Sequence, residues 1–156
     1  MRVYLLILVV ATAVTYVAVP VVRHIALVSN ALTPVRGRDV HTTPIPRLGG
    51  VAMFVGFATA VAVASQIPYL SMVIDSSAWA VVLGAGLVCL LGVVDDLWEL
   101  DWVTKLAGQI LAAGLMAWQG VQLITIPVGG LTIGSAGFSL GTTVLVVIVS
   151  INAVNF

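Results

Sequence analysis

Charged residues are scarce in this sequence. Asp, Glu, Lys and Arg make up 8% of its 156 residues, whereas a soluble domain has about 25%. Six acidic and six basic residues cancel to zero net charge, and none lies beyond Lys105. A chain so poor in charge cannot cover a globule with a solvated surface. The composition therefore excludes a solution enzyme, a nucleic-acid-binding protein and a disordered chain.

Cysteine is almost absent as well. The single Cys89 lies in an apolar run and has no second cysteine to pair with, so a disulfide framework is excluded. The sequence also has no low-complexity tract and no internal repeat. Hydrophobic residues, in contrast, make up 61% of the chain, and its mean hydropathy is +1.20. These values indicate a polytopic membrane protein.

Long apolar runs predict the membrane spans. A membrane helix needs about 17–25 mostly apolar residues. The first run is also longer than the apolar region of a signal peptide, which has roughly 7–15 residues. Glycines in and near the runs allow helices to approach closely. We therefore expect an all-α protein with residues 1–156 as a single membrane domain. The five expected spans are 3–22, 48–65, 78–94, 106–121 and 140–156, and the glycines are Gly49, Gly56, Gly84, Gly92, Gly108 and Gly114.

The uncharged segment 122–139 differs from the runs on either side. Residues 124–126 and 131–133 alternate in polarity around a Pro-Val-Gly-Gly turn. Such a pattern is typical of a β-hairpin. We expect a short extracytoplasmic hairpin between the fourth and fifth spans.

The basic residues predict the orientation of the spans. Four arginines lie between the first and second spans, and Lys105 lies between the third and fourth, whereas segments 66–77 and 122–139 contain neither Lys nor Arg. The positive-inside rule places the basic loops in the cytoplasm and the N-terminus outside, with Arg2 as a minor exception. The polar clusters described next then all lie on the cytoplasmic face.

The first cluster is Asp95-Asp96 at the end of the third span. The helix dipole opposes acids there by about 0.3–1 kcal/mol, and adjacent carboxylates repel each other. Such a pair suits a cation, a phosphate-bound metal or a proton; the alternative is a solvated interfacial pair. Lys105 suits a phosphate at the start of a helix or a snorkelling role. Glu99 and Asp101 are expected to be solvated, and Asp101 can pair with Lys105 along a helix.

Two further clusters lie on the same face. The first loop contains His41 and Arg47 within a stretch that also has two prolines and a glycine pair, and arginine binds phosphate oxygens bidentately. Asn152 and Asn155 end the fifth span on one helix face. Their amide oxygens suit a hard cation such as Mg²⁺. The alternative for the asparagines is hydrogen bonding between helices.

Three motifs in the same order resemble one superfamily. They are the Arg-x-Val-His and Pro-x-Pro-Arg-x-Gly-Gly elements of 38–50, the Asp-Asp loop of 92–96 with Lys105 nine residues on, and Asn-Ala-Val-Asn-Phe at 152–156. Together they resemble the polyprenyl-phosphate N-acetylhexosamine-1-phosphate transferases, glycosyltransferase family 4, over essentially the whole chain. Family members continue beyond the asparagine motif with further spans. We therefore expect an N-terminal fragment that is inactive alone.

The first loop indicates a branch of the superfamily. Residues 44–50, Pro-Ile-Pro-Arg-Leu-Gly-Gly, are similar to the GlcNAc-1-phosphate (WecA/TagO-like) branch, whereas the related MraY branch usually has Thr-Pro-Thr-Met-Gly-Gly. Asp39 resembles actinobacterial members, whose lipid is decaprenyl phosphate rather than undecaprenyl phosphate. The resemblance implies an enzyme of the bacterial plasma membrane that begins cell-wall or surface-polysaccharide synthesis.

The resemblance also implies a reaction and its residues. GlcNAc-1-phosphate passes from UDP-GlcNAc to a polyprenyl phosphate, and UMP is released with Mg²⁺ as cofactor. Asp95 is expected to bind or deprotonate the lipid phosphate, and Asp96 to support it and the metal site. The resemblance also implies that Asn155 is a Mg²⁺ ligand and that Lys105 binds a phosphate. Arg47, His41 and Asn152 are expected either to contact the substrate or to support residues that do.

Rival functions predict different features. A transporter subunit would place acids at mid-membrane, whereas Asp95 and Asp96 lie at the end of a span. A structural membrane subunit leaves the order of the motifs unexplained, and an MraY-type phospho-MurNAc-pentapeptide transferase is disfavoured by Arg47. Among partners we expect the bilayer, the two substrates and no nucleic acid, and we leave a homodimer open.

Overall fold

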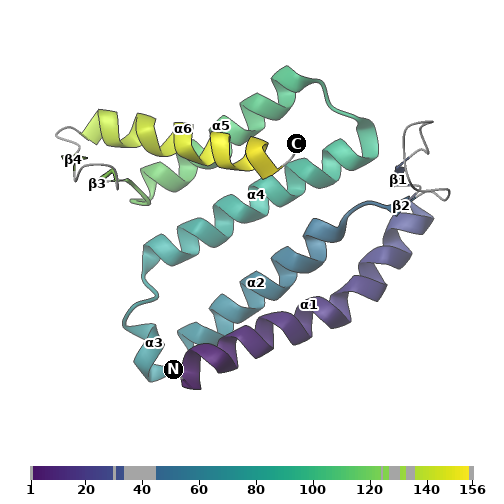
Figure 1. Ribbon diagram of the computed structural model, residues 1–156, viewed down its shortest axis with the longest axis horizontal. Coiled ribbons are helices and arrows are strands. Elements are labelled where there is room, and N and C mark those ends of the chain that lie inside the picture. Colours follow the sequence, from purple (N-terminus) through teal and green to yellow (C-terminus); the bar gives the residue numbers. More distant parts are fainter. Residues whose placement is uncertain are drawn as a thin grey trace. The chain divides into compact units, whose positions relative to one another are not determined.

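The computed structural model describes residues 2–29, 31–33, 45–123, 125–126, 131–132 and 136–154. Within them the chain is mainly helical (Figure 1). The helices are α1 (Arg2–Val28), α2 (Gly49–Ser65), the short α3 (Pro68–Ser71), α4 (Ser76–Trp98), α5 (Trp102–Trp118) and α6 (Ala136–Val154). The predicted all-α class is confirmed at this level.

Three of these helices are long and apolar enough to cross a membrane: α1 from Val3 to Val28, α4, and α6 from Ala136 to Ala153. Helix α2 is apolar but has only 17 residues. The outer surfaces of the long helices expose many large apolar side chains, for example Leu8, Leu90 and Leu145, each more than 60% exposed. Water does not favour such surfaces but lipid does, so this is a multi-pass membrane protein. The number of spans stays a prediction.

The helices extend beyond the predicted spans. Helix α1 continues six residues past the predicted end at 22, and α4 continues from 94 to Trp98. The predicted limits followed the apolar runs, but backbone hydrogen bonding continues into the polar interface beyond them. Helix α4 therefore includes Asp95 and Asp96 in its last turn.

Two pairs of very short strands accompany the helices. Strand β1 (Leu32–Thr33) pairs antiparallel with β2 (Ile45–Pro46), and β3 (Thr125–Ile126) with β4 (Leu131–Thr132). The first pair is not predicted by the sequence pattern. The second lies within segment 122–139, where the hairpin is predicted, but the residues that would join its strands lie outside the described residues. The complete hairpin stays a prediction.

The chain divides into two compact units, which we describe separately. The first comprises Met1–Val73 and Cys89–Leu100, and the second comprises Ile74–Val88 and Asp101–Phe156. Helix α4 thus contributes its second half to the first unit and its first half to the second unit.

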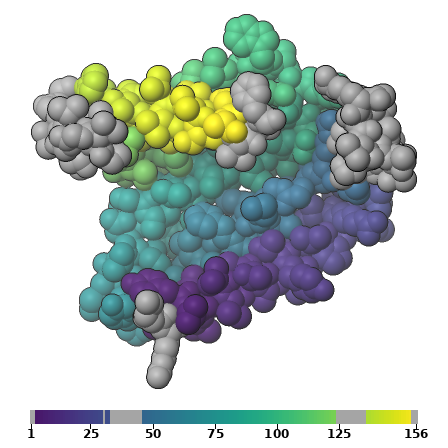
Figure 2. Space-filling model, viewed as in Figure 1, coloured from purple at the N-terminus to yellow at the C-terminus, as the bar shows by residue number. Residues whose placement is uncertain are grey.

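In the first unit, α1 and α2 pack side by side and antiparallel (Figures 1 and 2). The buried face of α2 has a small residue at every fourth position. A Cβ at Gly56 would collide with the Thr15 hydroxyl and the Ala11 carbonyl oxygen of α1, so glycine is required for this close approach. The small residues of this face are Ala52, Gly56, Ala60 and Ala64.

In the second unit, α5 packs against α6. The predicted role of glycine in packing also holds at Gly84 of α4, where a Cβ would collide with the Met116 side chain of α5. In contrast, a Cβ at Gly49, Gly92 or Gly114 would meet no described atom within 4 Å. At those three positions close packing stays a prediction, because glycine content alone does not identify which helix faces meet.

Candidate active site

The first half of the candidate site lies where α4 ends. Asp95 and Asp96 occupy the last turn of this helix and are half-buried. The Glu99 N–H donates to the Asp95 carbonyl oxygen at 2.9 Å, and the Leu100 N–H donates to Asp95 Oδ1 at 3.0 Å. Glu99 has the left-handed conformation, with φ 47°, that commonly ends a helix. Asp95 therefore stabilises the turn that leaves α4.

Asp96 holds a second segment of the chain. Its Oδ2 accepts a hydrogen bond of 3.2 Å from the Leu48 N–H, 48 residues earlier. Leu48 precedes α2 with φ 72°, a left-handed conformation that costs a residue with a Cβ roughly 1–2 kcal/mol. Its side chain is buried, 6% exposed, and packs with Val22, Ala26, Ala31 and Ala52. Burial of this side chain and the bond to Asp96 together offset the strain.

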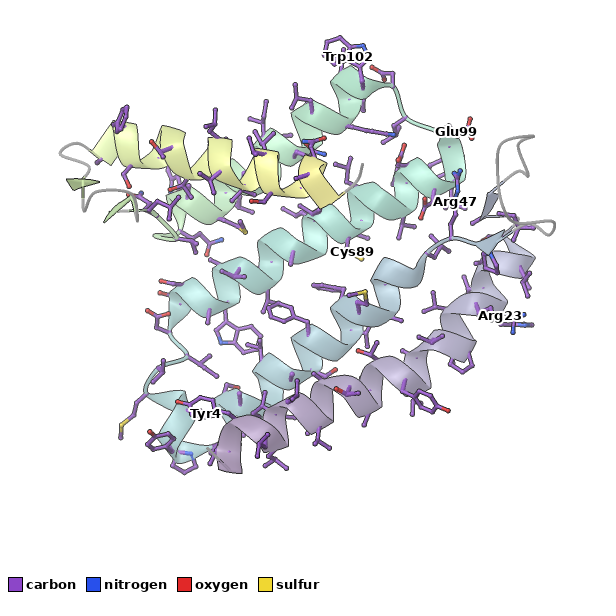
Figure 3. All side chains as sticks on the ribbon, viewed as in Figure 1. Tyr4, Arg23, Arg47, Cys89, Glu99 and Trp102 are labelled. Carbon is purple, nitrogen blue, oxygen red and sulfur yellow. The ribbon has the colours of Figure 1, made fainter. Side chains whose placement is uncertain are left out.

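The Leu48 contact brings the arginine of the first loop close to the acidic pair. Arg47 directly precedes Leu48, and its own N–H donates to the Ala31 carbonyl oxygen at 2.9 Å. The adjoining β2 pairs with β1. In Figure 3 the half-buried Arg47 lies near Glu99, the residue that directly follows α4. The structure thus joins the Pro-Arg-Leu-Gly-Gly segment to the Asp-Asp segment, as a shared site requires.

A hollow of about 180 Å³ adjoins this segment. It lies on the α1 and α2 side of Arg47, and most of its wall is apolar. Arg23 of α1 adds a second guanidinium group. The lining residues are Val19, Val22, Arg23, Pro46, Arg47, Gly49 and Ala52.

In the second unit, Lys105 lies in the first turn of α5. This helix begins at Trp102 because the Asp101 carboxylate caps it, accepting hydrogen bonds from the Val103 and Thr104 N–H groups at 3.2 and 3.3 Å. The Thr104 hydroxyl and N–H lower the pKa of Asp101 below its usual value. Asp101 is exposed, as predicted, but its role as a helix cap is missed by the sequence analysis. The Lys105 N–H donates to the Asp101 carbonyl oxygen at 3.1 Å, and the lysine side chain is half-buried.

One turn further along α5, Gln109 contacts the asparagine motif. Asn152 Nδ2 donates to Gln109 Oε1 at 2.7 Å and to the Ile148 carbonyl oxygen at 2.8 Å. Asn152 therefore makes an interhelical hydrogen bond, which is the alternative to cation binding that the sequence predicts for this residue. Gln109 is not among the site residues predicted from the sequence. A glutamine four residues after Lys105 in an apolar helix is nevertheless a signal for a buried polar contact.

The predicted site residues are thus distributed as follows. Asp95, Asp96 and Arg47 lie in the first unit, and Lys105 and Asn152 lie in the second. His41 and Asn155 lie outside the described residues. No group of three or more His, Cys, Asp or Glu side chains that could hold a metal occurs within the part that the structure describes. Two adjacent carboxylates nevertheless fit Mg²⁺, which takes one or two carboxylates and completes its shell with water and substrate phosphates.

Comparison with known proteins agrees with these motifs. A decaprenyl-phosphate N-acetylglucosaminephosphotransferase of Mycolicibacterium smegmatis is 41% identical over 94% of this chain and 37% of its own length. The protein of the same name from Mycobacterium tuberculosis is 43% identical over 94% of this chain and 38% of its own length. A probable undecaprenyl-phosphate N-acetylglucosaminyl 1-phosphate transferase of Bacillus subtilis is 30% identical over 87% of this chain and 37% of its own length. The chain therefore spans less than two fifths of these relatives.

No solved structure matches the chain. The sequence model for glycosyl transferase family 4 matches residues 78–156, about half of it. The matched region contains the acidic pair, Lys105 and the asparagine motif. On this match, the chain belongs to glycosyl transferase family 4.

Proposed function

We propose that this chain forms part of the active site of an enzyme that transfers GlcNAc-1-phosphate from UDP-GlcNAc to a polyprenyl phosphate. The hydrogen bond from the Leu48 N–H to Asp96 Oδ2 carries the proposal, because it joins two motifs that are far apart in the sequence. A protein that only filled the bilayer would not need an arginine loop held against an acidic pair. The names of the relatives, which are phosphotransferases for GlcNAc, support the same reaction.

In the proposed reaction, an oxygen of the lipid phosphate forms a bond to the β-phosphorus of UDP-GlcNAc. The bond from that phosphorus to the UMP oxygen breaks, and UMP leaves with the electron pair. Asp95 binds the lipid phosphate and accepts a proton if that phosphate arrives protonated. Catalysis of this kind depends on positioning and on neutralising charge at the transferred phosphoryl group.

Basic groups supply part of that neutralisation. Lys105, at the start of α5, and Arg47, beside the acidic pair, are the described candidates to bind phosphate oxygens. His41 is proposed to belong to the same substrate loop. Arginine is well suited to this role because its planar group binds phosphate oxygens in pairs.

We propose Mg²⁺ as the cofactor. Asp96, with support from Asp95, would hold it in the first unit, and Asn155 would add an amide oxygen. Bound there, Mg²⁺ would neutralise charge on the diphosphate. Asp96 Oδ2 already accepts the hydrogen bond from the Leu48 N–H. As a metal ligand, Asp96 would therefore also be bonded to the arginine loop.

The lipid substrate is consistent with the hollow beside Arg47. Its apolar wall suits an isoprenoid chain, and Arg23 and Arg47 suit the phosphate attached to that chain. We propose decaprenyl phosphate or undecaprenyl phosphate as the acceptor, in line with the names of the relatives. The enzyme would act at the cytoplasmic face of the bacterial plasma membrane, where the sugar nucleotide is made, and would begin the synthesis of a cell-wall or surface polysaccharide.

The test uses a chimaera, because the chain spans only 37% of the M. smegmatis relative. Residues 1–156 replace the matching segment of that relative, and membranes containing the chimaera receive UDP-GlcNAc, decaprenyl phosphate and Mg²⁺. We expect UMP release that depends on the lipid phosphate and stops when EDTA is added. UDP-MurNAc-pentapeptide serves as the competing donor.

Two results would contradict the proposal. A chimaera that inserts into membranes but releases no UMP would show that this segment does not form a working site. UMP release only from UDP-MurNAc-pentapeptide would contradict the assignment to GlcNAc transfer and favour the MraY-type reaction.

A further inference from the structure

Gln109 is a buried polar side chain in an otherwise apolar helix. It is 5% exposed, and its neighbours on the same face of α5 are the buried Ala112 and Ala113. Burial of an amide is costly unless its polar atoms are hydrogen-bonded. The bond of 2.7 Å from Asn152 Nδ2 to Gln109 Oε1 supplies a partner from α6.

The second hydrogen bond of Asn152 determines how this amide is oriented. Asn152 Nδ2 also donates to the Ile148 carbonyl oxygen at 2.8 Å. A carbonyl oxygen can only accept, so the Asn152 atom that faces it must be the nitrogen. Neither bond uses Asn152 Oδ1, which remains as the acceptor of this side chain. Without Gln109, one of the two constraints on the amide is lost.

The position of Gln109 links two residues of the proposed site. It lies four residues after Lys105, on the same face of α5. Asn152 in turn is the first residue of the Asn-Ala-Val-Asn-Phe motif. The amide pair therefore connects the helix turn that carries the phosphate-binding lysine to the helix turn that begins the asparagine motif.

We propose that Gln109 is a positioning residue for the transfer reaction. Its side-chain oxygen holds the Asn152 amide so that Asn152 Oδ1 is offered to the substrate complex, and it sets the register between Lys105 and the asparagine motif. This inference rests on the proposed function. A hydrogen bond that served only to join two helices would affect stability and leave turnover unchanged.

The experiment compares substitutions in the chimaera described above. Gln109→Met keeps the length and removes the acceptor, whereas Gln109→Glu keeps an oxygen at the same place. Asn152→Leu and the double variant complete a double-mutant cycle. Thr143→Val is the matched control: Thr143 is a buried residue of α6 whose Oγ1 accepts a 2.8 Å bond from the Leu123 N–H, and it belongs to no proposed binding group.

Kinetics and unfolding temperature are measured for each variant. Loss of a partner that orients a metal ligand typically costs about 10–100-fold in activity, and we expect Gln109→Met to lower kcat by a similar factor because Gln109 orients Asn152 in the same way. KM for UDP-GlcNAc should change by less than about threefold, since the lost interaction positions the reacting complex and adds little to donor binding. Gln109→Glu should restore most of kcat. The double variant should be no slower than Asn152→Leu alone, because the two residues act as one unit.

The control separates positioning from stability. Thr143→Val should lower the unfolding temperature and leave kcat unchanged. The positioning role is overturned if Gln109→Met lowers kcat no more than Thr143→Val, or if Gln109→Glu is as slow as Gln109→Met. A chimaera without substitutions that releases no UMP would instead overturn the proposed function. Additive unfolding effects in the double-mutant cycle would overturn the amide contact itself, whatever the activity.

Discussion

Each aspartate of the acidic pair holds a backbone N–H with one carboxylate oxygen. Asp95 holds Leu100, and Asp96 holds Leu48. The helix dipole costs acids at this end about 0.3–1 kcal/mol, whereas a hydrogen bond to a charged group contributes about 1.5–3 kcal/mol. The fold thus offsets the electrostatic cost that the sequence alone leaves unexplained. A test of catalysis must therefore preserve these two bonds.

The substitution Asp95→Asn meets that condition. Asparagine keeps an Oδ1 to accept from the Leu100 N–H but loses the negative charge and the base. Loss of a general base typically costs about 10²–10⁴-fold, so we expect kcat of the chimaera to fall by at least about a hundredfold. Steady-state UMP release measures the effect, and membrane insertion should be unchanged.

Glu99→Gln is the matched control for Asp95→Asn. It removes one negative charge from the same loop at an exposed position, and its turnover should stay within a few-fold of the unsubstituted chimaera. Near-normal turnover by Asp95→Asn would leave the pair with a purely structural role. Asp96→Asn should also lower turnover, with a larger change in the Mg²⁺ concentration required.

At the scale of the helices, small residues determine how closely α1 and α2 approach. Gly56 lies where the side chain of Thr15 and the backbone of Ala11 meet α2. Interfaces between membrane helices are typically built from such residues because lipid supplies no hydrophobic force between them. The Leu48 turn and the hollow beside Arg47 lie at one end of this helix pair. Packing along the pair therefore supports the position of the arginine loop.

We expect Gly56→Ala to push the two helices apart. Overpacking a close contact typically costs about 1–3 kcal/mol, and the neighbour here includes backbone, which cannot rotate away. Gly92→Ala is the control, because a Cβ at Gly92 meets no described atom within 4 Å. The free energy of unfolding of Gly92→Ala should rise by about 0.5–1 kcal/mol, because alanine is preferred over glycine inside a helix. Unfolding in detergent micelles measures both, and equal effects would contradict the packing described here.

At the scale of the whole molecule, the orientation in the membrane decides whether the proposed site meets a cytosolic substrate. The arginine loop and the acidic turn share a hydrogen bond, so they must lie on the same side of the bilayer. The basic residues of the first loop then predict that both lie on the cytoplasmic side.

Cysteine labelling tests this orientation. In a variant with Cys89→Ala, single cysteines at Arg36 and Glu99 should react only with reagents that reach the cytoplasm, and one at Ser135 only with an impermeant reagent added outside. The reason is that segment 122–139 contains no basic residue, so nothing retains it inside. Reaction of the Glu99 cysteine from outside would reverse the orientation and contradict a cytoplasmic site.

Much of this protein follows from its sequence. Low charge and long apolar runs predict membrane helices because the bilayer core cannot accept charge or unpaired backbone groups. The three motifs identify the family, and they place Asp95 and Asp96 at a helix end and Lys105 at a helix start. Each of these features is local, since it depends on composition or on residues within one or two helical turns.

Only the tertiary structure decides which distant groups meet. The bond from Leu48 to Asp96 and the bond from Asn152 to Gln109 join residues 48 and 43 positions apart. No helical period relates such residues. The same holds for the glycines: Gly56 and Gly84 pack closely, whereas a Cβ at Gly92 would meet no described atom within 4 Å, although all three occur in similar apolar runs. The physical reason is that composition determines whether a helix enters the membrane, whereas the angle and depth at which helices cross determine which side chains touch.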